Sequence, residues 1–259
     1  MDGDGAAMND ALRISAPDTN GVCRLTINRP DRANAIDAEL GDALLSALQG
    51  ASEDGTRILI LQAEGKHFSG GFDFSGCEAS SEGDLLLRFV RIEQALQLLS
   101  HAPFASIALT HNAAFGAGAD LVAACTYRIG TPSSQFRFPG YRFGVALGTR
   151  RLTSVVSEQR ARDILLTNRT LDAPEALECG LLTHLVVEDQ LDQTIDGIIG
   201  EILDLEAWSI TELLDNSQQL PGAADRDLAS LVRSVARPGL CARIAQYRAS
   251  INQSKGPQR

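Results

Sequence analysis

The chain has 259 residues, which is long enough for one large domain or for one domain with a helical appendage. Hydrophobic residues make up 44% of the chain and aromatic residues 5%, an ordinary composition for an α/β protein with a core of aliphatic side chains. The formal net charge of −10 argues against nucleic acid and against an anionic membrane surface as partners, because Lys and Arg drive both kinds of binding.

The five cysteines are scattered and include no C-x-x-C pair. This spacing predicts reduced thiols in a reducing compartment and no metal site. The first residues are acidic and lack the apolar segment of a signal peptide, and no run approaches the roughly 18 apolar residues of a membrane span. We therefore expect a cytoplasmic protein that does not bind a membrane.

The first part of the chain predicts a hairpin, a helix and a buried strand. The hairpin comprises residues 12–15 and 22–28, joined by a turn at 18–21. Asp37 is placed to cap a helix in which Ile36, Leu40, Leu44 and Leu48 recur every four residues. Residues 57–63 form a short apolar run that predicts the next strand.

The rest of the chain alternates strands with helices and then becomes helical. We predict a helix over 84–100, strands over 104–109 and 127–130, and an aromatic, arginine-rich loop over 136–144. The expected organisation is a disordered N-terminus at 1–10, an α/β core over 11–195 and a C-terminal helical region over 196–259.

Small residues at 111–120 separate the strand at 104–109 from a helix that includes residues 121–124. Free N–H groups at a helix start attract negative charge, and Asp120 would stand beside whatever they hold. This combination suggests chemistry on a carbonyl that becomes an oxyanion. Close packing alone would also explain the small residues. A dinucleotide-binding G-x-G-x-x-G motif fits less well, because Leu121 stands at the third glycine.

Five segments resemble, in order, motifs of the crotonase (enoyl-CoA hydratase/isomerase) superfamily. Residues 28–35 (NRPDRANA) are similar to its N-R-P-x-x-x-N-A motif, and 65–73 (GKHFSGGFD) to its G-x-x-F-S-A-G-x-D motif. Residues 111–121 (HNAAFGAGADL) resemble N-G-x-A-x-G-G-G-x-E-L. Farther on, 165–169 (LLTNR) and 173–182 (APEALECGLL) resemble L-L-T-G-R and A-x-E-A-x-x-x-G-L-V.

The resemblance implies an α/β fold, a crotonase-like spiral of ββα units with a C-terminal helical trimerisation region. It implies a homotrimer or a dimer of trimers that binds an acyl-CoA thioester. Two backbone N–H groups would stabilise the enolate anion, and by position they belong to Phe72 and Ala117. No metal or redox cofactor is implied, since coenzyme A enters as part of the substrate.

The acid–base residues of the family are only half present. Asp120 matches the first of the two glutamates that hydratases use, shortened by one methylene. The second should follow the proline of F-x-x-P-E, where this chain has Gly140. Hydration needs two such groups, whereas double-bond isomerisation, decarboxylation or hydrolysis can use one. We expect isomerisation first. The alternatives are a decarboxylase or hydrolase of an acidic acyl-CoA and a non-catalytic acyl-CoA-binding accessory subunit.

The resemblance also assigns residues to substrate and CoA binding. Arg32 matches a basic position near the nucleotide phosphates, and the backbone of Ala35 lies in the same wall. The remaining residues expected at the substrate are Gly70, Gly71, Gly116, Gly140 and Tyr141. Weaker candidates for CoA are Arg29, Lys66 and, near the C-terminus, Tyr247, Arg248 and Lys255.

Several polar residues near these motifs have two interpretations. His67 is expected to be structural, and His111 is either a base or a hydrogen-bonding loop residue. Arg137 and Arg142 either carry solvated surface charges or face the pocket and pair with an acidic acyl group or a CoA phosphate. Tyr141 could supply a hydroxyl in place of the missing glutamate.

Two acidic residues follow the first glycine-rich turn. Asp73 and Glu78 are expected to shape the loop or to lie in solvent rather than to act on substrate.

Overall fold

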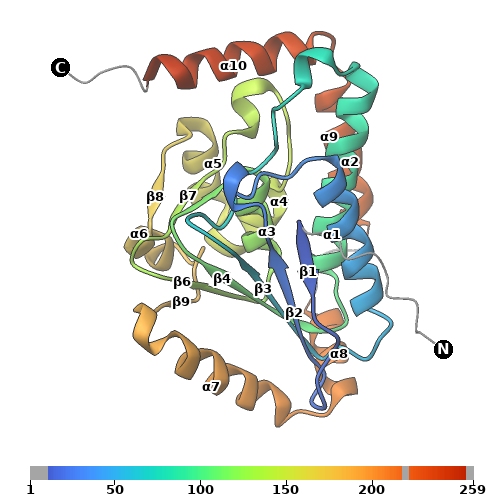
Figure 1. The fold of residues 1–259 in the computed structure, drawn as a ribbon, viewed down its shortest axis with the longest axis vertical. Coiled ribbons are helices and arrows are strands. Elements are labelled where there is room, and N and C mark those ends of the chain that lie inside the picture. Colours follow the sequence, from blue (N-terminus) through green and yellow to red (C-terminus); the bar gives the residue numbers. More distant parts are fainter. Residues whose placement is uncertain (1–10, 218–221, 255–259) are drawn as a thin grey trace.

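The computed structural model describes residues 11–217 and 222–254 as a mixed α/β fold with a C-terminal helical region (Figure 1). The N-terminal segment expected to be disordered, residues 1–10, lies outside the described residues. Two sheets form the framework, one of six strands in the order β1-β2-β3-β4-β6-β9 and one of three in the order β5-β7-β8.

The large sheet is parallel apart from its first strand. Strand β1 pairs antiparallel with β2, and every other neighbouring pair in this sheet is parallel. The strands of both sheets are β1 (Leu12–Ile14), β2 (Val22–Ile27), β3 (Ile58–Ala63), β4 (Ala105–Thr110), β5 (Ala113–Phe115), β6 (Tyr127–Gly130), β7 (Gln135–Arg137), β8 (Leu171–Asp172) and β9 (His184–Leu185).

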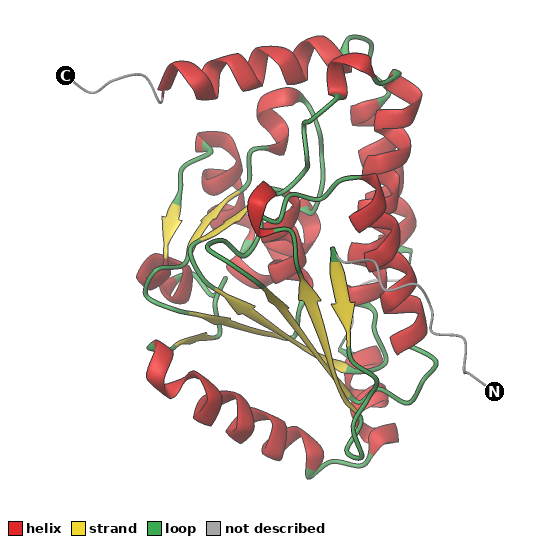
Figure 2. Ribbon diagram, in the orientation of Figure 1, coloured by secondary structure: helices red, strands yellow, loops and turns green. Residues whose placement is uncertain are grey.

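Helices follow most of the strands and make up the end of the chain (Figure 2). They are α1 (Ala38–Ala51), α2 (Glu82–Ser100), α3 (Ala117–Ala124), α4 (Thr149–Val156), α5 (Glu158–Thr167), α6 (Ala173–Glu178), α7 (Leu191–Leu203), α8 (Ala207–Asn216), α9 (Ala223–Val235) and α10 (Leu240–Ser254). Four short 3-10 helices, η1 (Pro30–Arg32), η2 (Cys77–Ala79), η3 (Gly140–Phe143) and η4 (Glu188–Gln190), lie in loops.

Alternating side chains of the large sheet supply two separate cores. Because successive residues of a strand point to opposite faces, Leu59 and Leu61 of β3 pack toward α1 and α2, while Ile58 and Ile60 pack on the other face. The second face is covered by α7, whose buried Ile195 joins the same cluster. Figure 1 shows α7 lying along this face. The expected boundary between core and helical region at residue 195 falls inside α7, and the division into domains stays a prediction.

Helices α1 and α2 begin within two residues of the predicted starts. The carboxylate of Asp37 accepts a hydrogen bond from the Leu40 N–H at 2.9 Å, which caps α1. Helix α2 begins two residues before the predicted start, because Ser81 and Asp84 form a reciprocal capping box. The predicted strand at 104–109 is β4, shifted by one residue.

The segment predicted as an aromatic, arginine-rich loop contains regular structure. It begins with the last residues of β7 and continues as η3 before the turn at Gly144. A three-residue strand is too short to give an alternating pattern, so the sequence carries no signal for it.

The last helix lies across the end of the molecule near η2 and η3 (Figure 1). Its Tyr247 packs on Phe143 of η3, with ring centroids 5.0 Å apart, and on Phe74. Helix α10 therefore covers the loops that precede α2 and α4.

Over residues 11–217 and 222–254, no helix is long and apolar enough to cross a membrane. The cytoplasmic location stays a prediction.

Candidate active site

The junction between β5 and α3 presents backbone N–H groups, as the sequence predicts. Gly116 turns the chain with a φ of 51°, and its N–H donates to the Arg137 carbonyl at 2.8 Å. Ala117 is the first residue of α3, so its N–H has no acceptor within the helix. We find no hydrogen bond from this N–H to any described residue.

The glycine-rich turn after β3 runs beside that junction. The N–H of Ser69 donates to the Ala113 carbonyl at 3.0 Å, and the N–H of Phe115 donates back to Ser69 at 2.9 Å. At Gly71, which has a φ of 87°, a Cβ atom would lie 2.4 Å from the Phe115 carbonyl oxygen and 3.3 Å from the Ala117 nitrogen. Only glycine permits both this conformation and this approach.

The N–H of Phe72 belongs to the peptide that follows Gly71. The Gly71 carbonyl accepts from the Ile36 N–H at 2.7 Å, and because a trans peptide directs its C=O and N–H oppositely, the Phe72 N–H points away from Ile36. Both Phe72 and Ala117 line one cavity of about 480 Å³. The structure thus brings together the two amides that the sequence pairs.

This cavity, which we call the acyl cavity, has a largely apolar wall. Its lining residues are Gly70, Phe72, Phe74, Phe89, Phe115, Gly116, Ala117, Asp120, Arg137, Phe138, Pro139, Gly140, Tyr141, Phe143, Val145, Leu147, Leu165, Tyr247 and Ile251. The Phe72 ring stacks on Phe89 with centroids 4.2 Å apart, and the Arg88 guanidinium lies over the Phe72 ring, 4.3 Å from its centroid. The bulky Phe72 side chain therefore belongs to the cavity wall.

Asp120 is the one carboxyl group among the described residues that line the acyl cavity. It lies in the first turn of α3 and is only 4% exposed. Its Oδ1 atom has no hydrogen-bond partner, and the backbone of Gly148 lies so close that a Cβ there would come within 1.8 Å of this atom. Burial raises the pKa of Asp120 well above its usual value, Glu93 raises it further, and Arg151 opposes the rise.

A buried ion pair lies close enough to Asp120 to affect the pKa of its carboxyl group. The Arg151 side chain on α4 binds Glu93 on α2 through both carboxylate oxygens, and the two side chains are 4% and 1% exposed. Arg151 also lies 3.5 Å from Asp227 of α9. Sequence analysis missed this pair, although Glu93 lies on the apolar stripe of α2 between Phe89 and Leu96, an unusual place for a charge.

Gly140 lines the acyl cavity where the second glutamate was expected, and its backbone is tightly enclosed. A Cβ atom at this position would lie 2.7 Å from the Val145 carbonyl oxygen. The neighbouring Tyr141 also lines the cavity, but its hydroxyl lies 2.9 Å from that of Thr149 and the side chain is 48% exposed. A carboxylate is therefore missing here, and the chain conformation itself leaves no room for a side chain.

The residues expected at the CoA nucleotide lie outside the acyl cavity. Arg32 is exposed in η1, and the Ala35 carbonyl accepts a hydrogen bond from Arg29. Arg29 also pairs with Asp37 at 2.7 Å and with Asp73 at 3.4 Å, so its charge is already compensated. The role of Arg32 and Ala35 in CoA binding stays a prediction, and Arg29 is tied to the protein itself.

Two histidines lie near the turn, and the structural role expected for His67 stays a prediction. The Nε2 atom of His111 lies 2.9 Å from the Gly65 carbonyl oxygen, so this side chain holds the loop. Burial, together with the charges of Lys66 and His111, lowers the pKa of His67. Neither histidine lines the acyl cavity.

The acidic residues after the turn are also engaged with protein groups. Asp73 accepts a hydrogen bond from the Ser75 N–H at 2.8 Å and pairs with Arg29. Glu78 forms an ion pair with Arg248 of α10. Both therefore shape the loop, and they join it to the last helix.

The two arginines of the 136–144 segment differ. Arg142 donates to the carbonyls of Leu166 and Thr167 at 3.0 and 2.8 Å and does not line the acyl cavity. Arg137 does line it. Among the C-terminal candidates, Tyr247 lines the cavity as well, whereas Lys255 lies outside the described residues.

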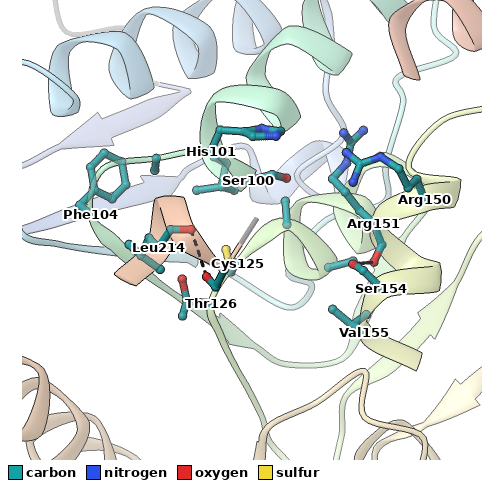
Figure 3. A pocket seen from close by; sticks show the side chains of 15 residues that line it. Ser100, His101, Phe104, Cys125, Thr126, Arg150, Arg151, Ser154, Val155 and Leu214 are labelled. Carbon is teal, nitrogen blue, oxygen red and sulfur yellow. Dashed lines mark hydrogen bonds between the residues drawn. The ribbon is translucent and has the colours of Figure 1, made fainter. Parts of the chain in front are cut away.

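A second cavity of about 260 Å³ shares no lining residue with the first (Figure 3). It lies between the ends of α2 and α3 and helix α4, and Figure 3 shows Arg150 and Arg151 together at one edge. Burial raises the pKa of its Cys125 to about 12, so this thiol stays protonated and is a poor nucleophile.

Comparisons with known proteins agree with this geometry. A family model described as enoyl-CoA hydratase/isomerase matches residues 18–219. The Mycobacterium leprae protein named "Probable enoyl-CoA hydratase echA6" is 32% identical over 204 residues, which cover 76% of this chain and 74% of that protein. A 4-chlorobenzoyl coenzyme A dehalogenase-2 from Arthrobacter is 27% identical, covering 93% of this chain and 92% of its own.

The fold is also that of solved relatives. A structure from Bordetella parapertussis, described as an enoyl-CoA hydratase/isomerase, has a TM-score of 0.88 and 39% identity and covers 92% of this chain and 98% of that one. The architecture is thus the crotonase fold. The chain belongs to the enoyl-CoA hydratase/isomerase family of the crotonase superfamily. It is an acyl-CoA enzyme of that family, in which relatives carry different reaction names.

Proposed function

We propose that this protein isomerises the double bond of an enoyl-CoA through an enolate, using a single carboxylate. The observation that carries the proposal is that, in the part of the chain that the structure describes, Asp120 is the one carboxyl group lining the acyl cavity, while Gly140 provides no second. Coenzyme A is part of the substrate, and we propose no further cofactor.

The reaction would begin with the thioester carbonyl oxygen between the N–H groups of Phe72 and Ala117. Negative charge develops on this oxygen as the enolate forms, and each such donor typically contributes about 2.7–4 kcal/mol to the stability of the transition state. Neither amide needs another partner among the described residues, so both are available to the oxyanion.

Asp120 would move the proton. Its carboxylate takes a proton from C2 of a 3-enoyl-CoA, the double bond shifts from C3–C4 to C2–C3, and the same proton is returned to C4. Because burial raises the pKa of Asp120, its ionised form is a stronger base than an ordinary aspartate and its protonated form persists closer to neutral pH. Both properties suit one group that must accept and return a proton.

Decarboxylation of an acidic acyl-CoA is a second candidate. It is favoured by one observation, the Arg137 side chain in the wall of the acyl cavity. Loss of carbon dioxide from a carboxyl group on C2, the carbon next to the thioester carbonyl, also gives a thioester enolate. The two amides would therefore serve either reaction.

The test is a screen of the purified protein and of Asp120→Asn against crotonyl-CoA, a 3-enoyl-CoA and methylmalonyl-CoA. We expect turnover of the 3-enoyl-CoA, little hydration of crotonyl-CoA, and a loss in Asp120→Asn of about 100- to 10,000-fold. Fast hydration of crotonyl-CoA would contradict the proposal. Binding of all three without turnover would support the accessory-subunit alternative instead.

A further inference from the structure

The acyl cavity contains one positive charge without a counter-ion. Of the described residues that line it, only Asp120 and Arg137 carry a formal charge when ionised. None of the ion pairs in the described part of the chain includes Arg137. Its Nε atom is buried and has no hydrogen-bond partner. No ion pair among these joins Arg137 to Asp120, the one carboxyl group among the described residues of the cavity wall.

The other arginines around the site are used by the protein. Arg29 pairs with Asp37 and Asp73, Arg142 donates to two carbonyls, and Arg151 pairs with Glu93. Arg137 differs from them because it forms no ion pair with a described residue and its Nε atom has no hydrogen-bond partner. Its guanidinium lies 5.0 Å from the centroid of the Phe115 ring.

Arg137 is held beside the reacting groups. Residue 137 ends β7 and pairs with Phe115 of β5, and its carbonyl accepts from the Gly116 N–H at 2.8 Å. The next amide along the chain is that of Ala117, one of the two that we propose for the oxyanion. An anion bound by Arg137 would therefore lie within the same cavity as the acyl chain.

A second polar group stands near the guanidinium. Burial raises the pKa of the Tyr247 hydroxyl, and the charge of Arg137 and a hydrogen bond with it oppose that rise. Tyr247 lies on α10 and lines the cavity. Around this pair the wall consists of aromatic rings, and a charge buried against such a wall is stabilised by an opposite charge. The planar guanidinium fits a carboxylate through two parallel hydrogen bonds.

We propose that Arg137 binds a carboxylate carried by the acyl group, so that the preferred substrates are CoA monothioesters of dicarboxylic acids. The inference rests on the proposed acyl-CoA chemistry and names its substrate class. A phosphate of coenzyme A is the other anion that a guanidinium could hold, and the experiment separates the two.

The experiment measures binding by titration calorimetry with two saturated ligands, glutaryl-CoA and valeryl-CoA. Both have five acyl carbons, and neither can isomerise, so the measurement does not depend on turnover. We expect the wild-type protein to bind glutaryl-CoA at least tenfold more tightly, as one charge-assisted contact typically provides. Arg137→Met should remove this preference and leave valeryl-CoA binding within about twofold, an estimate that follows from the same contact.

Two further variants are the controls. Arg137→Lys keeps the charge and should retain part of the preference. Arg142→Met removes a nearby arginine that lies outside the acyl cavity and should leave the ratio between the two ligands unchanged. If Arg137→Met does not fold, the ratio of the wild-type affinities for glutaryl-CoA and valeryl-CoA tests the proposal by itself.

Equal affinity of the wild-type protein for both ligands would overturn the proposal. Equal weakening of both ligands in Arg137→Met would also overturn it and would assign Arg137 to a phosphate of coenzyme A. The glutaryl and valeryl thioesters of pantetheine, which carry no phosphate, should show the same preference as the CoA thioesters. Preference for glutaryl-CoA in a protein that fails to isomerise any enoyl-CoA would support the carboxylate site and contradict the isomerase proposal alone.

Discussion

At the scale of single residues, Asp120 combines the features that a proton shuttle needs with a cost to stability. Its carboxyl group is buried in α3, lacks a partner at Oδ1 and has a raised pKa. Below the ordinary aspartate pKa of about 3.9, it is protonated in both the folded and the unfolded chain. Above that value the unfolded chain ionises while the folded chain keeps its proton, so the free energy of unfolding falls by about 1.4 kcal/mol per pH unit until the folded pKa is reached.

Asp120→Asn should therefore stabilise the protein at neutral pH and abolish its activity. The gain should shrink as the pH falls and vanish below the ordinary aspartate pKa. Thermal unfolding measured across this pH range checks the prediction.

Asp73→Asn is the matched control, with the opposite sign. Burial alone would raise the pKa of Asp73, but hydrogen bonds from Ser75 and the charge of Arg29 outweigh it, and the pKa is lowered. Its ionised form therefore stabilises the fold at neutral pH, and this contribution is lost as the pH falls through the lowered pKa. If both variants lost stability at neutral pH, the account of Asp120 would be wrong.

Gly140→Glu should not create an efficient hydratase. The new Cβ atom would meet the Val145 carbonyl at 2.7 Å, so the backbone of η3 must shift. We expect a loss of about 1–3 kcal/mol in stability, as overpacking typically costs, and no gain in hydration of crotonyl-CoA. Gly50→Glu is the control, because nothing lies within 4 Å of a Cβ at that position. Fast hydration by a stable Gly140→Glu protein would contradict the inference that the η3 backbone does not accommodate a side chain at position 140.

At the scale of secondary-structure elements, the Glu93–Arg151 ion pair connects α2 to α4, and both of these helices pack against α3. Removing one partner leaves the other charge buried, whereas an exposed pair contributes little. Arg151→Met should therefore cost about 3–5 kcal/mol of stability. It should also raise the pKa of Asp120 further, because the charge of Arg151 opposes that rise.

Chemical denaturation measures the loss in the free energy of unfolding. The pH dependence of isomerisation measures the shift in the pKa of Asp120. Arg162→Met breaks an exposed pair with Glu158 on α5 and serves as the control, with an expected loss below about 0.5 kcal/mol. Similar losses for the two variants would contradict a structural role for the buried pair.

The same scale shows which elements the sequence could predict. The caps at Asp37 and Ser81 and the apolar runs of β3 and β4 are local signals, and the predicted elements match the observed ones within one or two residues. The two glycine-rich turns were also predictable, because glycine is required where Gly71 meets Phe115.

The features that the sequence did not predict depend on contacts between segments that are distant in the chain. Glu93 and Arg151 are 58 residues apart in sequence, and no local pattern pairs them. The sequence likewise left open which of Arg137 and Arg142 faces the cavity. The answer depends on the short strand β7, which pairs with β5 and places Arg137 beside Phe115.

At the scale of the whole molecule, α10 and α3 both contribute to the wall of the acyl cavity. Tyr247 and Ile251 line the cavity, and Arg248 binds Glu78 in the loop before α2. The last helix thus contributes both to the wall of the site and to the fixing of that loop.

The trimer or dimer of trimers expected from the family resemblance stays a prediction. Helix α8 exposes large apolar side chains, with Trp208 67% exposed and Leu213 58% exposed. Burial of such side chains between subunits would be favourable. Light scattering should give three or six times the 27.7 kDa chain mass, and Trp208→Lys should lower that value. A monomer at micromolar concentration would contradict the prediction.

The most direct test of the account follows the fate of a 3-enoyl-CoA by NMR in heavy water. The substrates are 3-hexenoyl-CoA and the monothioester of 3-hexenedioic acid, with the wild-type protein and Asp120→Asn. We expect conversion to the 2-enoyl-CoA, no 3-hydroxyacyl-CoA formed at a similar rate, and loss of the conversion in Asp120→Asn. Accumulation of the 3-hydroxyacyl-CoA, or isomerisation that survives Asp120→Asn, would contradict a mechanism built on one carboxylate and two amides.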